Sequence, residues 1–78
     1  MPESEADQAG SLKWFDVQKA YGFIVADRGP DVFVHINVLR QYGIDTFALA
    51  TSPGKRLRFK TAPGVVNDTP VAISIFVE

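Results

Sequence analysis

Two short segments of alternating residues, 20–24 and 31–36, constrain the fold of this chain more than any other feature of its sequence. Alternation with a period of two is typical of a half-buried β-strand. It directs three side chains toward a core, namely Ile24, Val32 and Val34. It directs four rings toward solvent, namely Tyr21, Phe23, Phe33 and His35. Because large exposed apolar patches reduce solubility, a small protein with such a row of rings is expected to offer them to a ligand, and nucleic-acid bases are the first candidates.

The composition indicates one small domain. With 78 residues, the core is near the lower limit at which a chain folds unaided, and with no cysteine neither a disulfide nor a thiolate zinc site supports it. No apolar run reaches the roughly 18–20 residues of a membrane span. The first residues also lack the basic segment followed by an apolar segment that is typical of a signal peptide. We therefore expect a cytoplasmic protein that makes no membrane contact.

The charge is unevenly distributed along the chain. The net charge is −1, but the first ten residues carry Glu3, Glu5 and Asp7 and no side-chain cation, which leaves residues 11–78 at +2. Residues 1–10 are interpreted as a disordered acidic tail and residues 11–78 as the folded domain. A net charge of +2 is too small to hold phosphates by charge alone, so nucleic-acid binding would have to depend on base stacking.

Five segments have the composition of strands: 11–17, 21–26, 31–36, 55–61 and 71–77. The last of them is apolar enough to be covered on much of both faces. Residues 37–53 fit neither period well, and a helical turn near 37–41 followed by an irregular crossover is expected there. Five short antiparallel strands with a break after the third predict an all-β fold, a small closed or partly open barrel, because closure removes exposed edges.

At two places in the predicted strands the sequence is compatible with more than one local conformation. Trp14 and Phe15 are neighbours, so a regular strand would place one in the core and the other in solvent, whereas a β-bulge would turn both toward the ligand. Gly22 lies between two outward rings, where the missing Cβ permits strong coiling or a close approach of the backbone.

Three runs of residues resemble the cold-shock domain family. They are Lys-Trp-Phe-Asp at 13–16, Lys-Ala-Tyr-Gly-Phe-Ile at 19–24 and Asp-Val-Phe-Val-His-Ile at 31–36. The family has two ribonucleoprotein motifs of the form Lys-Gly-(Phe/Tyr)-Gly-Phe-Ile and Val-Phe-Val-His. The match is close over residues 12–39 and thin from residue 40 onward. Three positions depart from the family pattern: Ala20 replaces Gly, Ile36 replaces the Phe of many members, and Asn37 replaces Ser or Thr, where it can still cap a helical turn.

The resemblance implies a five-stranded antiparallel OB-fold barrel over residues 11–78 that binds single-stranded RNA or DNA with little sequence preference. It implies that bases stack on six side chains: Trp14, Phe15, Tyr21, Phe23, Phe33 and His35. It also implies that Lys13 and Lys19 contact the nucleic-acid backbone. Ile36 is expected to leave one stacking platform missing.

The leading hypothesis is a monomeric module that keeps strands unpaired, as an RNA chaperone, an antiterminator or a regulator of transcription or translation does. The alternative is a degenerate barrel whose aromatic face docks on a protein, as in a weak dimer or on a sister domain. An enzyme is the weakest hypothesis, because one histidine, no cysteine and no clustered carboxylates offer no metal site, no cofactor site and no base–nucleophile pair.

Overall fold

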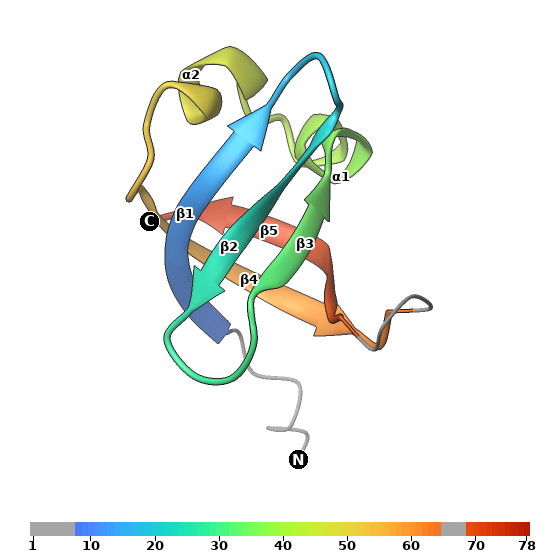
Figure 1. Ribbon diagram of the computed structural model, residues 1–78. Helices are drawn as coiled ribbons and strands as arrows, with labels where there is room; N and C mark the ends of the chain where they lie inside the picture. Colours follow the sequence, from blue (N-terminus) through green and yellow to red (C-terminus); the bar gives the residue numbers. More distant parts are fainter. Residues whose placement is uncertain (1–7, 65–68) are drawn as a thin grey trace.

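The computed structural model describes residues 8–64 and 69–78, which form a small barrel with two short helices at one end (Figure 1). In chain order the elements are β1 (Gln8–Asp16), β2 (Tyr21–Ala26), β3 (Val32–His35), α1 (Ile36–Gln41), α2 (Thr46–Ala50), β4 (Arg56–Ala62) and β5 (Val71–Val77). The sheet closes on itself in the order β1-β2-β3-β5-β4, and β4 pairs with β1. The predicted all-β, five-stranded OB-type barrel is confirmed.

One junction of the barrel is parallel. β3 meets β5 through the single pair Phe33 and Val71, and the Phe33 N–H donates to the Pro70 carbonyl at 2.9 Å. The other strand pairs are antiparallel, so the expectation of a wholly antiparallel barrel is wrong at this point. The crossover through α1 and α2 separates β3 from the β4–β5 pair, and a connection longer than a hairpin permits the two strands to run in the same direction.

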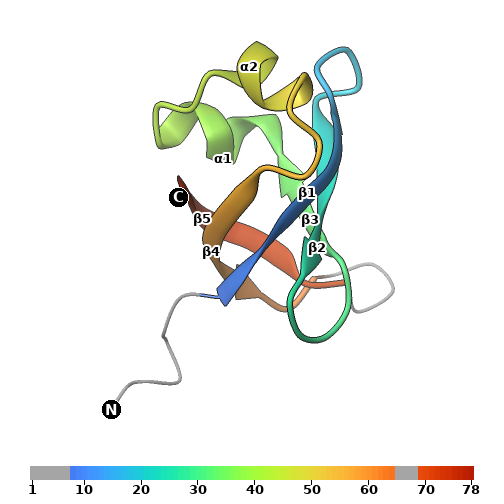
Figure 2. The same ribbon diagram turned by 90° about the vertical axis from the view of Figure 1, so that its left-hand side faces the viewer.

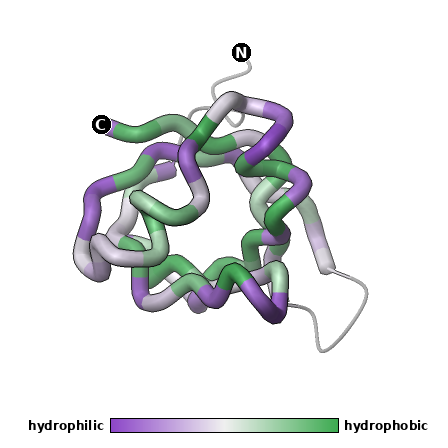
Figure 3. The backbone as a smooth tube through the Cα atoms, turned by 90° about the horizontal axis from the view of Figure 1, so that it is seen from above, coloured by the Kyte–Doolittle hydropathy of each residue, from purple (hydrophilic) through white to green (hydrophobic). Residues whose placement is uncertain are grey.

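The core fills the barrel with side chains from every strand. Ile24, Val32 and Val34 are buried as the alternation predicted, and Leu57 and Phe59 of β4 are completely buried. Figure 3 shows the backbone from above as a closed ring with many apolar positions around it. This burial is the main stabilising contribution, because the chain has neither disulfide nor thiolate metal site.

The two helices cover one end of the barrel (Figure 2). The expected helical turn at 37–41 is confirmed as α1, which inserts Leu39 into the core. The expected irregular crossover is wrong, because α2 forms over Thr46–Ala50 and buries Leu49. Asp45 starts this helix by accepting a hydrogen bond from the Ala48 N–H at 3.1 Å, the normal action of an N-cap carboxylate. Within the described residues no helix has the length and apolar character needed to cross a membrane.

The folded chain begins earlier than residue 11. Gln8, Ala9 and Gly10 belong to β1 and pair with Phe59, Arg58 and Leu57 of β4, so the tail boundary predicted at residue 10 is wrong. The sequence did not predict this part of the strand because these residues have few apolar side chains. Backbone pairing with β4 keeps them in the sheet. The first seven residues of the predicted disordered tail lie outside the described part of the chain.

β5 is covered on one face only. Ala72 and Ile75 are completely buried, but Ile73, Phe76 and Val77 are exposed, so the expectation that this strand is covered on both faces is wrong. The barrel has a single layer of strands, so the outward side chains of β5 stay largely exposed, and the ring of Tyr42 covers only part of Phe76.

Candidate nucleic-acid interface

Four aromatic rings lie together on the outer surface of β1, β2 and β3. Cross-strand register brings them side by side, because Trp14 pairs with Phe23, which in turn pairs with Phe33. Tyr21 precedes Phe23 by two positions on β2 and so points to the same side of the sheet. We call these four residues, Trp14, Tyr21, Phe23 and Phe33, the ring cluster. The cluster is partly exposed, and Trp14 retains 37% of its surface accessible.

The rings of the cluster contact one another directly. Tyr21 and Phe33 are stacked with centroids 5.5 Å apart and planes inclined by 29°, whereas Phe23 meets Phe33 nearly edge to face at 5.6 Å and 76°. The ring centroid of Trp14 lies 5.5 Å from the ring centroids of both Tyr21 and Phe23. Such contacts between aromatic rings are favourable beyond their area, so the cluster forms a surface of fixed shape.

A bulge in β1 decides between the alternatives for Trp14 and Phe15. Leu12 pairs with Ile24 and Trp14 pairs with Phe23, so Lys13 is an extra residue that turns outward together with Trp14. Phe15 then returns to the core with 6% exposure. The structure therefore does not bring Phe15 to the ring cluster, and its expected position as a stacking platform is wrong. The strand does bulge, but it exposes the lysine before Trp14 and not the phenylalanine after it.

The two lysines assigned to the interface have different surroundings. Lys13 lies on the bulge beside Trp14, and its Nζ is 2.9 Å from Oδ2 of Asp31. Lys19 is exposed in the turn between β1 and β2, where its backbone N–H donates to Oδ1 of Asp16 at 3.1 Å. The Asp31 carboxylate balances one of the two positive charges at this site.

His35 ends β3 and starts α1. It pairs with Tyr21 across the sheet, and its Nδ1 accepts a hydrogen bond at 3.1 Å from the Asn37 N–H. A ring nitrogen that accepts a hydrogen bond carries no proton, so the neutral ring holds its proton on Nε2, which is left to act as a donor.

Ile36 and Asn37, the two residues after His35 that depart from the family pattern, both belong to α1. Ile36 is buried as the first residue of α1, which is consistent with a missing platform there. The expectation that Asn37 caps the helical turn is wrong, because the cap is the side chain of His35 and Asn37 lies inside the helix.

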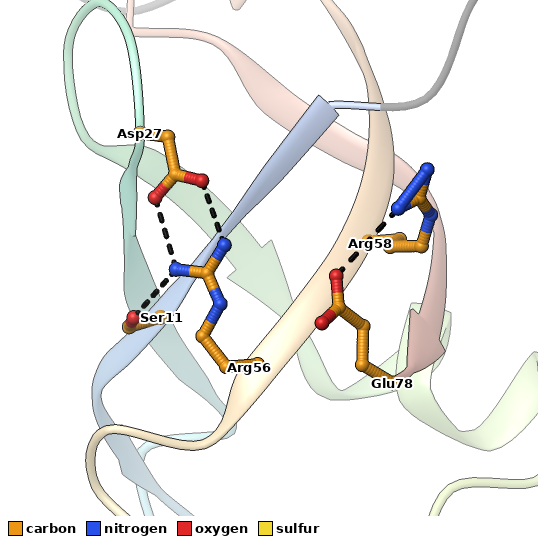
Figure 4. A network of polar contacts seen from close by, with 5 residues as sticks. All are labelled: Ser11, Asp27, Arg56, Arg58 and Glu78. Atoms are coloured by element: carbon orange, nitrogen blue, oxygen red, sulfur yellow. Dashed lines mark hydrogen bonds and ion pairs between the residues drawn. The ribbon is translucent and has the colours of Figure 1, made fainter.

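A second ion-paired group ties the barrel together away from the ring cluster (Figure 4). Arg56 of β4 donates two hydrogen bonds to Asp27, at 2.9 and 2.7 Å, and one to Oγ of Ser11 at 3.1 Å. The hydrogen bonds from Arg56 lower the pKa of the Asp27 carboxyl below its ordinary value of 3.8 and raise the pKa of the guanidinium. This bidentate pair joins β4 to the end of β2.

Sequence reasoning missed the acidic partners of these cations. Asp27 and Asp31 flank a turn, and turn chemistry is a sufficient reason for aspartates at such positions. The structure shows that each also pairs with a cation from another strand. The missing information was the register of β1 and of β3 with β2, the strand between them, since no local pattern links Lys13 to Asp31. Among the residues that the structure describes, no three potential metal ligands come together.

Comparison with known proteins places this geometry in a family. The model of the 'Cold-shock' DNA-binding domain matches residues 8–69. The cold shock protein CspB of Bacillus caldolyticus is 35% identical over 68 residues, which cover 87% of this chain and 94% of that protein. The cold shock-like protein CspD of Bacillus cereus is 34% identical with the same coverage. A cold shock-like protein of Thermotoga maritima is 51% identical over 37 residues, covering 47% of this chain and 56% of the relative.

The chain therefore belongs to the cold-shock DNA-binding domain family, as its sequence motifs predicted. Membership in this family supports nucleic-acid binding of the cold-shock type. The ring cluster gives that activity a candidate surface.

Proposed function

We propose that this protein binds single-stranded RNA or DNA by stacking bases on the ring cluster, and that it keeps the bound strand unpaired as an RNA chaperone or antiterminator does. The observation that carries the proposal is the contiguity of four mutually contacting, partly exposed rings over three adjacent strands. Rings that served only the core would be buried. Four rings exposed side by side would reduce solubility unless a ligand covers them.

Stacking suits this surface because its shape is fixed before the ligand arrives. The contacts within the ring cluster hold the side chains in place, so little rotamer entropy is lost on binding. Stacking a base on an aromatic side chain contributes about 1–3 kcal/mol and tolerates any base, since every base has a π-face. Several platforms together therefore support binding without strong sequence preference.

The charges at the interface make a smaller contribution. Lys13 is already paired with Asp31, and residues 11–78 carry a net charge of only +2. If three cations reach phosphates, the slope of log K against log salt for a single strand is about −2. Most of the binding free energy then resides in the rings, and raised salt weakens binding only moderately.

His35 adds a directional contact at the border of the ring cluster. Its Nδ1 is engaged by α1, so the neutral ring offers an Nε2–H donor beside Tyr21. Carbonyl oxygens of unpaired bases and phosphate oxygens both accept such a bond. His35 thereby orients the strand without specifying one base.

The chaperone activity follows from mass action. A protein that binds unpaired bases and not paired ones shifts the equilibrium away from base-paired structure by RT ln(1 + [protein]/Kd). Unwinding by this route needs no chemical reaction. Where a hairpin controls transcription or translation, the same shift makes the protein a regulator of that step.

The test is a fluorescence titration of Trp14, the chain's single tryptophan. A pyrimidine-rich oligonucleotide is expected to quench the emission, and the same oligonucleotide annealed to its complement is expected to quench it far less, because its bases are no longer free. In parallel, the ring resonances of Phe23 and His35 should shift. The proposal fails if millimolar single strand neither quenches Trp14 nor moves these resonances.

A further inference from the structure

A second group of apolar side chains is exposed on β5 and after α1. The rings of Tyr42 and Phe76 meet edge to face with centroids 5.4 Å apart, and they are 38% and 47% exposed. Val77 follows Phe76 in the chain and is 45% exposed. We call Tyr42, Phe76 and Val77 the β5 patch. Its rings are as exposed as any ring of the ring cluster, and the nucleic-acid interface makes no use of them.

The β5 patch continues into a groove of about 360 Å³ in which Val77 is one of the lining residues. Ile44, Ala48 and Leu49 contribute the apolar part of the groove wall. The groove lies between the α1–α2 connection, α2, the segment before β4 and the end of β5. An aromatic pair beside an apolar groove has the composition of the central part of a protein interface.

The same groove carries charges of both signs. Asp45 and Lys55 both line it, and neither forms an ion pair with another residue in the described ranges. One oxygen of Asp45 caps α2 through the Ala48 N–H, and the carboxylate remains exposed at the groove. A surface with an acid and a base in one apolar groove is complementary to a copy of itself.

The β5 patch faces away from the ring cluster. Figures 1 and 2 both show β2 and β3 on one side of the barrel and β4 with the C-terminal part of β5 on the other. Arg58 pairs with Phe76 across the sheet, but its guanidinium is 3.6 Å from the Glu78 carboxylate, which balances its charge. This charge balance favours a protein over a nucleic acid as the occupant of the patch.

We propose that the β5 patch binds a second copy of this chain around a two-fold axis. In such a contact each surface meets itself, so Asp45 of one copy faces Lys55 of the other and the reverse pair forms at the same time. Tyr42, Phe76 and Val77 of both copies fill the centre, and the charged pairs lie at the rim.

This arrangement leaves both ring clusters at the outer surface of the dimer. One dimer then holds two single-stranded segments, which brings two strands, or two parts of one strand, close together. That consequence rests on the proposed function, whereas the dimer itself does not. Self-association is therefore measured without nucleic acid, so that failure of one proposal is distinguishable from failure of the other.

The experiment is sedimentation equilibrium of the full chain between about 10 μM and about 1 mM, the range of weak self-association. The mass is expected to rise with concentration toward twice that of the monomer. Phe76→Ser should keep the chain monomeric over the whole range, and Lys55→Glu should weaken association at least tenfold. Raised salt should weaken association of the wild type more than that of Lys55→Glu.

Two control variants distinguish this surface from others. Phe47→Ser removes a ring of α2 that is 70% exposed and is not among the groove-lining residues, and Phe33→Ala alters the ring cluster, so both should leave the dimer intact. Circular dichroism melts of each variant separate a failure to associate from a failure to fold. A monomer at every concentration overturns the proposal. So does a dimer that Phe76→Ser leaves intact or one that Phe33→Ala dissolves, the latter indicating docking through the aromatic face.

Discussion

Gly22 lies directly against the backbone of Trp14: a Cβ at Gly22 would stand 2.3 Å from the Trp14 carbonyl oxygen. The next nearest atoms, Cα and Cδ1 of Phe15, would both be 2.7 Å away. The expected close approach of the backbone at this glycine is thereby confirmed. It is what permits β1 to bulge outward with Trp14 while Phe15 turns into the core.

We therefore expect Gly22→Ala to be strongly destabilising. The clash involves backbone atoms that cannot move aside, and the cost should reach about 3 kcal/mol or more, measured by urea unfolding. Gly29→Ala is the matched control, because a Cβ there meets nothing within 4 Å and only its φ of +84° is unfavourable. That variant should lose about 1–2 kcal/mol. Equal losses in the two variants would contradict the role of the close approach.

Replacing Ala20 with glycine is expected to stabilise the fold. Its φ is +68°, and it is the one non-glycine residue with positive φ in the ranges 8–64 and 69–78. A left-handed conformation costs an alanine about 1–2 kcal/mol, and the greater flexibility of glycine in the unfolded chain offsets part of the gain. Ala20→Gly should thus stabilise the fold by about 0.5–1 kcal/mol in thermal or urea unfolding. Ala48→Gly, in α2, should instead destabilise it by about 1 kcal/mol.

The alternation of the sequence predicted the barrel well. β2 and β5 have the predicted bounds, and the inward positions of β2, β3 and β4 are the buried ones. These properties depend on whether a side chain meets the core or water, which a period of two reports directly. The outward rings of β2 and β3 were predicted for the same reason.

The remaining features depend on contacts between distant parts of the chain. A bulge adds one residue to β1, so alternation alone could not tell that Lys13 and Trp14 share a face and Phe15 does not. Strand register brings Asp31 to Lys13, and no local pattern records it. α2 has five residues, too few for a helical period to be evident, although Asp45 is a recognisable N-cap.

The ion pair of Asp31 with Lys13 leads to a prediction about binding. Asp31→Asn removes the carboxylate and leaves Lys13 free to contact a phosphate, so the slope of log K against log salt should become more negative by about 0.7. Affinity for a single strand should rise at low salt and converge with the wild type at high salt. Asp45→Asn makes the same change of charge near α2 and keeps an N-cap residue, so its slope should match the wild type. An unchanged slope in Asp31→Asn would show that Asp31 does not keep Lys13 from a phosphate.

The ion pair of Asp27 with Arg56 should make stability depend on pH at the acidic end. The pKa of Asp27 is lowered in the folded chain, so the unfolded chain binds the proton more readily, and the contribution of the pair is present above pH 3.8 and lost as the pH falls through the folded pKa. The melting temperature of Asp27→Asn should accordingly lie below that of the wild type at neutral pH. Once the pH has fallen below the folded pKa of Asp27, the two melting temperatures should converge. A difference that persists undiminished in acid would assign the effect of the substitution to something other than the charge of Asp27.

Phe23→Ala should weaken both nucleic-acid binding and folding. The sequence alone suggests that this ring faces water and that its removal leaves folding unchanged, but the structure shows it half-buried against Trp14 and Phe33. Binding should weaken by about 1–3 kcal/mol in fluorescence titration, and stability should fall by about 0.5–1.5 kcal/mol for each neighbouring ring that Phe23 no longer meets. Phe47→Ala removes a more exposed ring that touches no ring of the ring cluster and should change neither quantity by more than about 0.5 kcal/mol. If Phe23→Ala loses stability but binds the single strand as tightly as the wild type, this ring is a support for its neighbours and not a platform for a base.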